Sequence, residues 1–163
     1  MKTLAAPADR AEIVERLRRL RPDSQRRWGR MTAPQMIMHL SDAFLGLLGE
    51  RKPPDGLLKP SSGPPRSRSR TGQLIAKWYA VYSPFSWPRG FRTRPEIDAE
   101  KGGTKPGDFA ADVAALEALA ARFADPSNAS KRKPHFAFGT MNEAEWCRWG
   151  WRHMDHHLRQ FGV

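Results

Sequence analysis

The sequence has few of the residues that mark secreted or membrane proteins. Its single cysteine, Cys147, cannot form an intrachain disulfide. The first residues lack the run of about 7 to 15 apolar residues that a signal peptide needs. The most apolar interior stretch, residues 74–87, is interrupted by Lys77 and Pro84 and is shorter than the roughly 20 residues of a membrane span. We therefore expect a cytoplasmic protein that does not bind membranes.

Acidic residues are also scarce, since 17 Asp and Glu face 28 Lys and Arg and leave a formal charge of +11. Such a balance is typical of nucleic-acid-binding proteins. However, about five of the surplus charges lie in residues 51–70, a Pro/Ser-rich segment without the stacking aromatics or recognition helix of such proteins. We interpret this segment as a solvated surface and do not expect nucleic-acid binding. The alternative is that it recruits an acidic partner.

The residues that are plentiful indicate one folded domain over residues 1–163. Apolar residues make up 39% of the chain, and six Trp and eight Phe are enough for a substantial core. Two connections, 50–70 and 84–107, are longer than is usual in compact domains. We expect each of them to be either a lid over a site or a mobile segment.

Apolar periodicity predicts five helices and no convincing strand. The first runs from about Asp9, its expected N-cap, to Leu20. The second begins with a capping box of Thr32 and Gln35 and ends near Gly49. Because this second helix is apolar on nearly every side, we expect neighbouring helices to enclose it.

The other three helices follow the same rules. A pattern over residues 71–83 places Leu74, Ile75, Trp78 and Tyr82 on one face. The next helix begins after Asp108 as N-cap and ends before Pro126, and the last begins with a Thr140–Glu143 capping box and reaches Phe161. These elements predict an all-α fold.

Three of the five histidines lie close together in the last predicted helix. His153 and His157 are four residues apart, so both rings lie on one face and can bind one metal ion. His156 could replace His157 as a partner at three residues, but we prefer the row Trp146, Gly150, His153, His157. That row is expected to face inward, with glycine leaving room beside the imidazole ring. The alternative for the pair is a surface position near the helix C-terminus, where imidazolium complements the helix dipole.

A third ligand is expected from His39, in the middle of the enclosed second helix. A buried imidazole is costly unless it is hydrogen-bonded or bound to metal, although a lone core histidine is more often a satisfied packing residue. Asp42, one turn further on, could orient His39 through its other ring nitrogen. Zinc is the expected divalent metal, with nickel, manganese and iron as alternatives.

The sequence gives less support to other catalytic roles. A zinc peptidase would need glutamate directly after the first histidine of its H-E-x-x-H motif, and Met154 stands there. Cys147 lies about 120° around the helix from the His153 row, which favours a packed thiol over a nucleophile or ligand. His135, in a basic loop, indicates no role by itself.

Several sequence pieces resemble a known superfamily. MIMHL in the second predicted helix and HMDHHLRQ in the last resemble the DinB and YfiT-like metal-dependent helical bundles. More closely, RWGRMTAPQMIMHLSDAF, GGTKPGDF, FGTMNEAEW and RHMDHHLRQFG look like a bacterial branch of that superfamily carried as a domain of unknown function. The resemblance implies a four-helix bundle with an extra short N-terminal helix and two long loops. It also implies a divalent metal on His39, His153 and His157.

The resemblance further implies a function. Several members of the superfamily are similar to transferases or isomerases in which a metal activates a low-molecular-weight thiol, an analogy at the level of fold. It implies a metal-dependent thiol S-transferase or hydrolase that takes such a thiol and a small-molecule substrate. The alternative is a non-catalytic module that binds metal, a partner or nucleic acid. Bundles of this kind often form homodimers, and nothing in the sequence fixes the oligomeric state.

Overall fold

The computed structural model describes residues 1–51, 70–90, 93–132, 134–135 and 137–163. Its elements are α1 (Pro7–Arg18), α2 (Ala33–Leu47), α3 (Arg70–Val81), the 3-10 helix η1 (Pro95–Ile97), α4 (Phe109–Ala124), the 3-10 helix η2 (Pro126–Lys131) and α5 (Glu143–Phe161). Within these residues the only β-type pairing is an isolated bridge between His135 and Gly139. The predicted all-α fold is confirmed.

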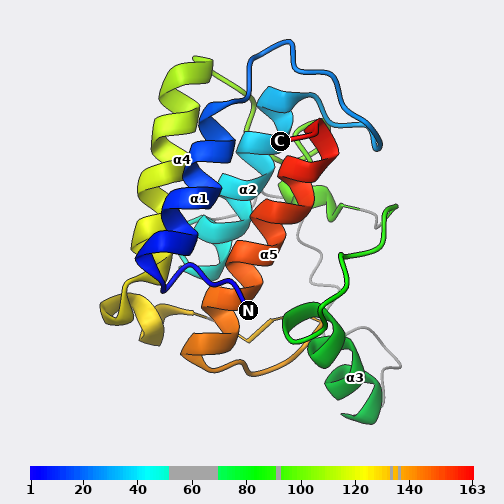
Figure 1. Cartoon of the computed structure of the whole chain (residues 1–163), viewed down its shortest axis with the longest axis vertical. Coiled ribbons are helices and arrows are strands. Elements are labelled where there is room, and N and C mark those ends of the chain that lie inside the picture. The colour runs from blue at the N-terminus through cyan, green and yellow to red at the C-terminus, as the bar shows by residue number, and fades with distance from the viewer. Residues whose placement is uncertain (52–69, 91–92, 133, 136) are drawn as a thin grey trace.

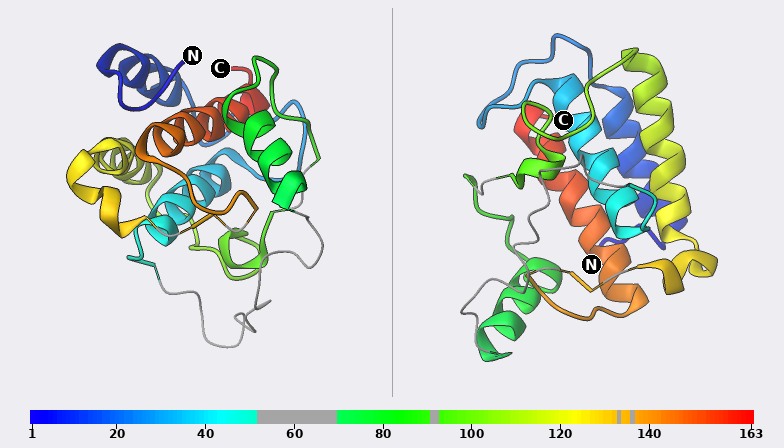
Figure 2. Two further views of the ribbon diagram at one scale, coloured as in Figure 1. Left: turned by 90° about the horizontal axis from the view of Figure 1, so that it is seen from below. Right: turned by 180° about the vertical axis from the view of Figure 1, so that it is seen from behind.

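Four helices, α1, α2, α4 and α5, lie side by side and form the bundle (Figures 1 and 2). The helix that stands apart is α3, which contacts α5 below the bundle in Figure 1. The N-terminal helix α1 is thus one of the four helices of the bundle. Ile13 and Leu17 of α1 are fully buried against the bundle, whereas Leu74 and Ile75 of α3 are 60% and 64% exposed.

The expectation that Asp9 caps the N-terminus of α1 was wrong. The helix begins at Pro7 after Ala6, which makes no side-chain cap, and Asp9 lies inside the first turn. Proline suits this position because its fixed φ matches the helix and its missing N–H would have had no partner. The carboxylate of Asp9 instead accepts a hydrogen bond from the backbone N–H of Thr3 at 2.9 Å. It therefore ties down the segment before the helix.

The central helix α2 has the predicted start. Thr32 is its N-cap, and the reciprocal bonds of the capping box with Gln35 are both present. The helix is buried along most of its length, as its apolar composition predicted. The α4 N-cap, Asp108, is likewise confirmed, since its side chain accepts from the N–H of Ala111.

The start of α5 lies two residues later than expected. Asn142, not Thr140, is the N-cap, and it forms a capping box with Glu145. Asn142 can replace threonine because its side-chain oxygen accepts from the Glu145 N–H while the Glu145 carboxylate accepts from the Asn142 N–H. The same carboxylate binds Lys77 at 3.0 Å and the Tyr82 hydroxyl at 3.0 Å. Glu145 thus anchors α3 to the bundle.

Gly150 has a different role from the one expected. Its row does face inward, since Trp146, His153 and His157 are all buried. However, a Cβ atom at Gly150 would lie 2.7 Å from Leu4 Cδ1, so an aliphatic side chain occupies the space that glycine leaves. Gly150 therefore lets the N-terminal segment approach α5.

Of the two long connections, only that of residues 84–107 lies largely within the described residues. The predicted basic loop of residues 50–70 lies almost entirely outside the described residues. In the connection of residues 84–107, Trp87 packs against His156 of α5, and η1 packs against α2. In the described part of the chain, no helix is both long enough and apolar enough to span a bilayer.

Candidate metal centre

Three histidines from two helices converge inside the bundle. His39 of α2 meets His153 and His157 of α5, and one nitrogen of each ring lies within 4.8 Å of the other two. The Nε2 atoms of His39 and His153 are 3.2 Å apart. All three side chains are buried, with 5% to 8% of each residue exposed. The structure thus brings together the three histidines that the sequence singled out, whereas His156 lies outside the group.

The ring of His39 is oriented by a backbone carbonyl. Its Nδ1 lies 3.1 Å from the carbonyl oxygen of Ile97, at the end of η1. A carbonyl can only accept, so Nδ1 carries the proton and the neutral ring presents an unprotonated Nε2 to the other histidines. Asp42 does not have the orienting role expected for it, because its carboxylate binds Thr104 and Arg51 instead.

His157 is oriented by a side chain one turn away. Its Nδ1 lies 3.1 Å from Oε1 of Gln160, while Nε2 of Gln160 donates to the Trp28 carbonyl at 2.8 Å. The bond to Trp28 defines which end of the Gln160 amide is the oxygen, so His157 Nδ1 is the donor. His157 consequently also keeps Nε2 unprotonated when neutral.

The third ring, that of His153, has fewer hydrogen-bond partners than the other two. Its Nδ1 is buried and has no hydrogen-bond partner among the described residues. Its Nε2 faces the unprotonated Nε2 of His39, and two lone pairs at 3.2 Å repel unless a proton or a cation lies between them. Nitrogen ligands at about 2.0–2.1 Å from a tetrahedral zinc ion would be separated by about 3.3 Å. The donor set thus fits a metal ion.

Burial keeps the three rings in the form that binds metal. Removal from water lowers the pKa of His39 below its ordinary value, against the opposing effect of the Ile97 carbonyl. Burial and then the neighbouring histidines hold the pKa values of His153 and His157 well below the ordinary value. All three imidazoles are therefore neutral at pH 7.

Aromatic side chains enclose the group. Trp149 lies next to His153 with 4.8 Å between ring centroids, and Trp87 lies 5.8 Å from the same ring. Trp87 comes from the long 84–107 connection, which also supplies the Ile97 carbonyl. Sequence reasoning missed both contributions. A backbone carbonyl has no residue signature, and a tryptophan in a loop has no periodicity to place it.

The remaining candidates are packing residues. Cys147 is fully buried, and burial raises the pKa of its thiol, as expected for a packed side chain. His135 stacks on Phe138 at 4.2 Å and lies outside the three-histidine group. Burial, together with the charge of Arg94, lowers its pKa to about 3.

Comparison with known proteins relates one part of the chain to a family. Residues 91–162 match a family described as a protein of unknown function, DUF1569. This stretch is less than half of the chain and includes His153 and His157 but not His39. Neither the curated proteins nor the solved structures gave a significant match.

Proposed function

We propose that His39, His153 and His157 bind one divalent metal ion through their Nε2 atoms, in a metal-dependent enzyme of the DinB and YfiT-like type. The observation that carries this proposal is the convergence of three buried, neutral imidazoles, two of which, His39 and His157, present an unprotonated Nε2 to the same small region. The sequence resemblance supports the same assignment independently of the geometry.

The ligand set suits catalysis as well as binding. Three protein ligands are typical of catalytic zinc sites, which keep a position open for water or substrate. When bound there, a divalent ion would supply Lewis acidity that lowers the pKa of a thiol or water. Zinc is the metal we expect, and nickel, manganese and iron also accept imidazole ligands.

The chain's own residues would prepare the site in two ways. The Ile97 carbonyl and Gln160 fix the tautomers and orientations of two ligands before any metal arrives. Trp87 and Trp149 cover His153 and limit the access of bulk water. The reaction class we propose is transfer of a low-molecular-weight thiol to a small electrophilic substrate, or hydrolysis of such a substrate.

Metal content provides the first test. Elemental mass spectrometry on untagged protein, purified without chelator, should give close to one metal ion per chain. The variants His39→Ala and His153→Ala should each lose it, and His156→Ala, a matched change on the same helix, should retain it. Absence of metal from the wild type, even after reconstitution with zinc, would contradict the proposal.

Catalysis requires a separate measurement. Metal-loaded and chelator-treated protein should be assayed with glutathione, cysteine and coenzyme A against 1-chloro-2,4-dinitrobenzene, and with thioester and amide substrates for hydrolysis. Turnover that disappears with the metal and in His153→Ala would support the enzyme. One bound metal without turnover on any substrate would favour the non-catalytic metal-binding module.

A further inference from the structure

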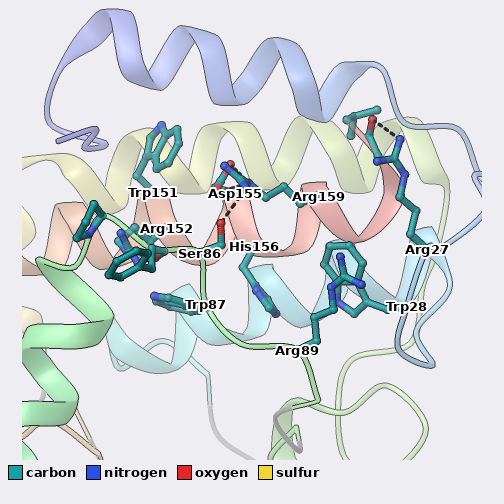
Figure 3. A pocket seen from close by; sticks show the side chains of 14 residues that line it. Arg27, Trp28, Ser86, Trp87, Arg89, Trp151, Arg152, Asp155, His156 and Arg159 are labelled. Carbon is teal, nitrogen blue, oxygen red and sulfur yellow. Dashed lines mark hydrogen bonds and ion pairs between the residues drawn. The ribbon is translucent and has the colours of Figure 1, made fainter.

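A cavity of ≈ 380 Å³ lies beside the three-histidine group and is distinct from it. The C-terminal half of α5, residues 84–89 and the loop at residues 27–28 form its walls (Figure 3). Trp87 separates the two sites, since its ring lies 5.8 Å from His153 and 5.8 Å from His156, which lines the cavity. The volume falls within the range of small-molecule sites.

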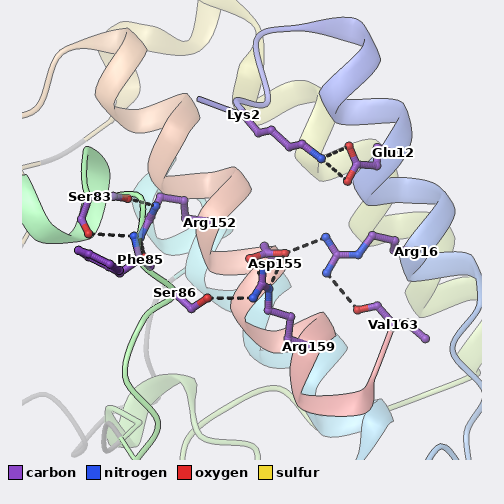
Figure 4. A network of polar contacts seen from close by, with 10 residues as sticks. All are labelled: Lys2, Glu12, Arg16, Ser83, Phe85, Ser86, Arg152, Asp155, Arg159 and Val163. Carbon is purple, nitrogen blue, oxygen red and sulfur yellow. Dashed lines mark hydrogen bonds and ion pairs between the residues drawn. The ribbon is translucent and has the colours of Figure 1, made fainter.

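The cavity is strongly basic. Four arginine side chains line it, against one acidic side chain, that of Asp155. That carboxylate is already bound by Arg16 at 2.8 Å and by Arg159 at 2.9 Å (Figure 4). Asp155 is therefore neutralised, and the cavity keeps a surplus of positive charge.

Two of the four arginines form hydrogen bonds that stabilise the wall of the cavity. Arg152 donates to the carbonyl oxygens of Ser83 and Phe85, and Arg159 donates to the Ser86 hydroxyl at 2.8 Å (Figure 4). These bonds hold residues 83–86 against α5. The cavity is consequently shaped before any ligand enters.

The other two arginines remain available. Neither Arg27 nor Arg89 forms an ion pair with a carboxylate in the described parts of the chain. The Arg89 guanidinium stacks over the Trp28 ring at 4.2 Å from its centroid, and the Arg27 guanidinium packs against Gly162, whose carbonyl oxygen lies 3.5 Å away. Both side chains are exposed at the cavity. Two such guanidinium groups, one of them stacked on an indole ring, can bind an anionic group that carries an attached ring.

We propose that this cavity binds a small aromatic carboxylate. Arg27 and Arg89 hold its carboxylate, and its ring packs against the aromatic side chains that line the cavity, Trp28, Trp87 and His156. The planar guanidinium suits a carboxylate because it can donate two parallel N–H bonds, and the indole faces supply apolar contact to a ring. This site does not depend on metal at the three histidines.

Isothermal titration calorimetry with 1-naphthoate tests the proposal. We expect saturable binding that weakens with salt and is at least about tenfold weaker for the neutral analogue 1-naphthalenemethanol. Arg89→Gln and Arg27→Gln should each weaken binding at least about tenfold, the loss expected for one charged hydrogen-bonding partner. Lys131→Gln, which removes the same charge from η2 outside the cavity, should leave binding unchanged. Circular dichroism verifies that each variant is folded, and the two arginine variants test the site independently.

Three results of these titrations would each overturn the proposal. They are no saturable binding up to ~10 mM, equal binding of the neutral analogue, and binding that both arginine variants retain. Chelator-treated wild-type protein separates this proposal from the metal site. Naphthoate binding should persist after chelation, and its loss would place the carboxylate on the metal and also overturn the cavity assignment.

Discussion

Thr104 donates two hydrogen bonds to Asp42, from its backbone N–H at 2.8 Å and from its hydroxyl at 2.7 Å. Arg51 binds the same carboxylate at 2.7 Å and also donates to the carbonyls of Glu96 and Gly102. These bonds fasten the segment around η1 to α2. They therefore position the Ile97 carbonyl that orients His39, so Asp42 acts on the site through the backbone.

Removal of this carboxylate should destabilise the protein. Asp42 is 1% exposed, and Asp42→Ala would leave Arg51 without its buried partner. We expect a loss of about 3–5 kcal/mol in the free energy of unfolding, measured by urea denaturation. Asp23→Asn, at an exposed turn, is the control and should change it by less than about 0.5 kcal/mol. An Asp42→Ala protein as stable as the control would show that the network contributes nothing.

Gln160 should matter for metal affinity more than for folding. Gln160→Ala removes the acceptor of the His157 Nδ1 proton, so the ring would no longer be fixed for binding through Nε2. We expect the affinity for zinc to fall about 10–100-fold, measured by competition with a chromophoric chelator. Gln25→Ala, an exposed glutamine, should bind zinc as the wild type does. Equal affinity for Gln160→Ala would exclude the orienting role.

The contact between Gly150 and Leu4 predicts a coupled pair of substitutions. Gly150→Ala places a methyl group into Leu4, Phe44 and Phe123, and overpacking of this kind costs about 1–3 kcal/mol. Leu4→Ala also destabilises, because it empties a fully buried position. In the double variant the new methyl group partly fills the space left by Leu4, so the total loss should be smaller than the sum of the two. Strict additivity in a thermal or urea double-mutant cycle would contradict this packing.

Glu145 should make the stability of the α3 attachment depend on pH. Burial alone would raise its pKa, but the Asn142 N–H, Lys77 and Tyr82 outweigh it and hold the pKa below the ordinary value. The folded state therefore favours the carboxylate, and this contribution is complete above the unfolded pKa of about 4.3 and is lost as pH falls through the folded pKa.

The comparison with Glu145→Gln tests this dependence. At pH 7 the variant should be less stable by about 1–3 kcal/mol in urea denaturation, and the difference should shrink steadily as the pH is lowered below 4. Glu143→Gln, exposed in the same helical turn, should show a much smaller difference at every pH. A difference between wild type and Glu145→Gln that is constant from pH 7 to about pH 3 would contradict the assignment.

The basic charge of the chain allows a test of the nucleic-acid alternative. We expect random-sequence DNA to bind no more tightly than micromolar at physiological salt, because the charge lacks the aromatic or helical elements of a nucleic-acid reader. Fluorescence anisotropy at two salt concentrations measures this. Nanomolar binding at physiological salt would make the binding module the better proposal.

The sequence alone determined the local features of this protein. Helix positions followed from apolar periodicity and from caps such as Thr32 and Asp108, which act within one turn of the chain. The pairing of His153 and His157 followed from helical geometry in the same way. The start of α5 was predicted at Thr140, whereas Asn142, two residues further along the chain, is the N-cap.

Tertiary structure decided which distant groups complete the site. The Ile97 carbonyl and His39 are 58 residues apart in the sequence. They meet because Asp42 binds both Arg51 and Thr104, which holds the segment around η1 against α2. The side chain of Leu4 fills the space beside Gly150. Helix α1 packs within the bundle, whereas α3 contacts α5 from outside it. These outcomes depend on which surfaces pack best across the whole chain, and no pattern of neighbouring residues contains that information.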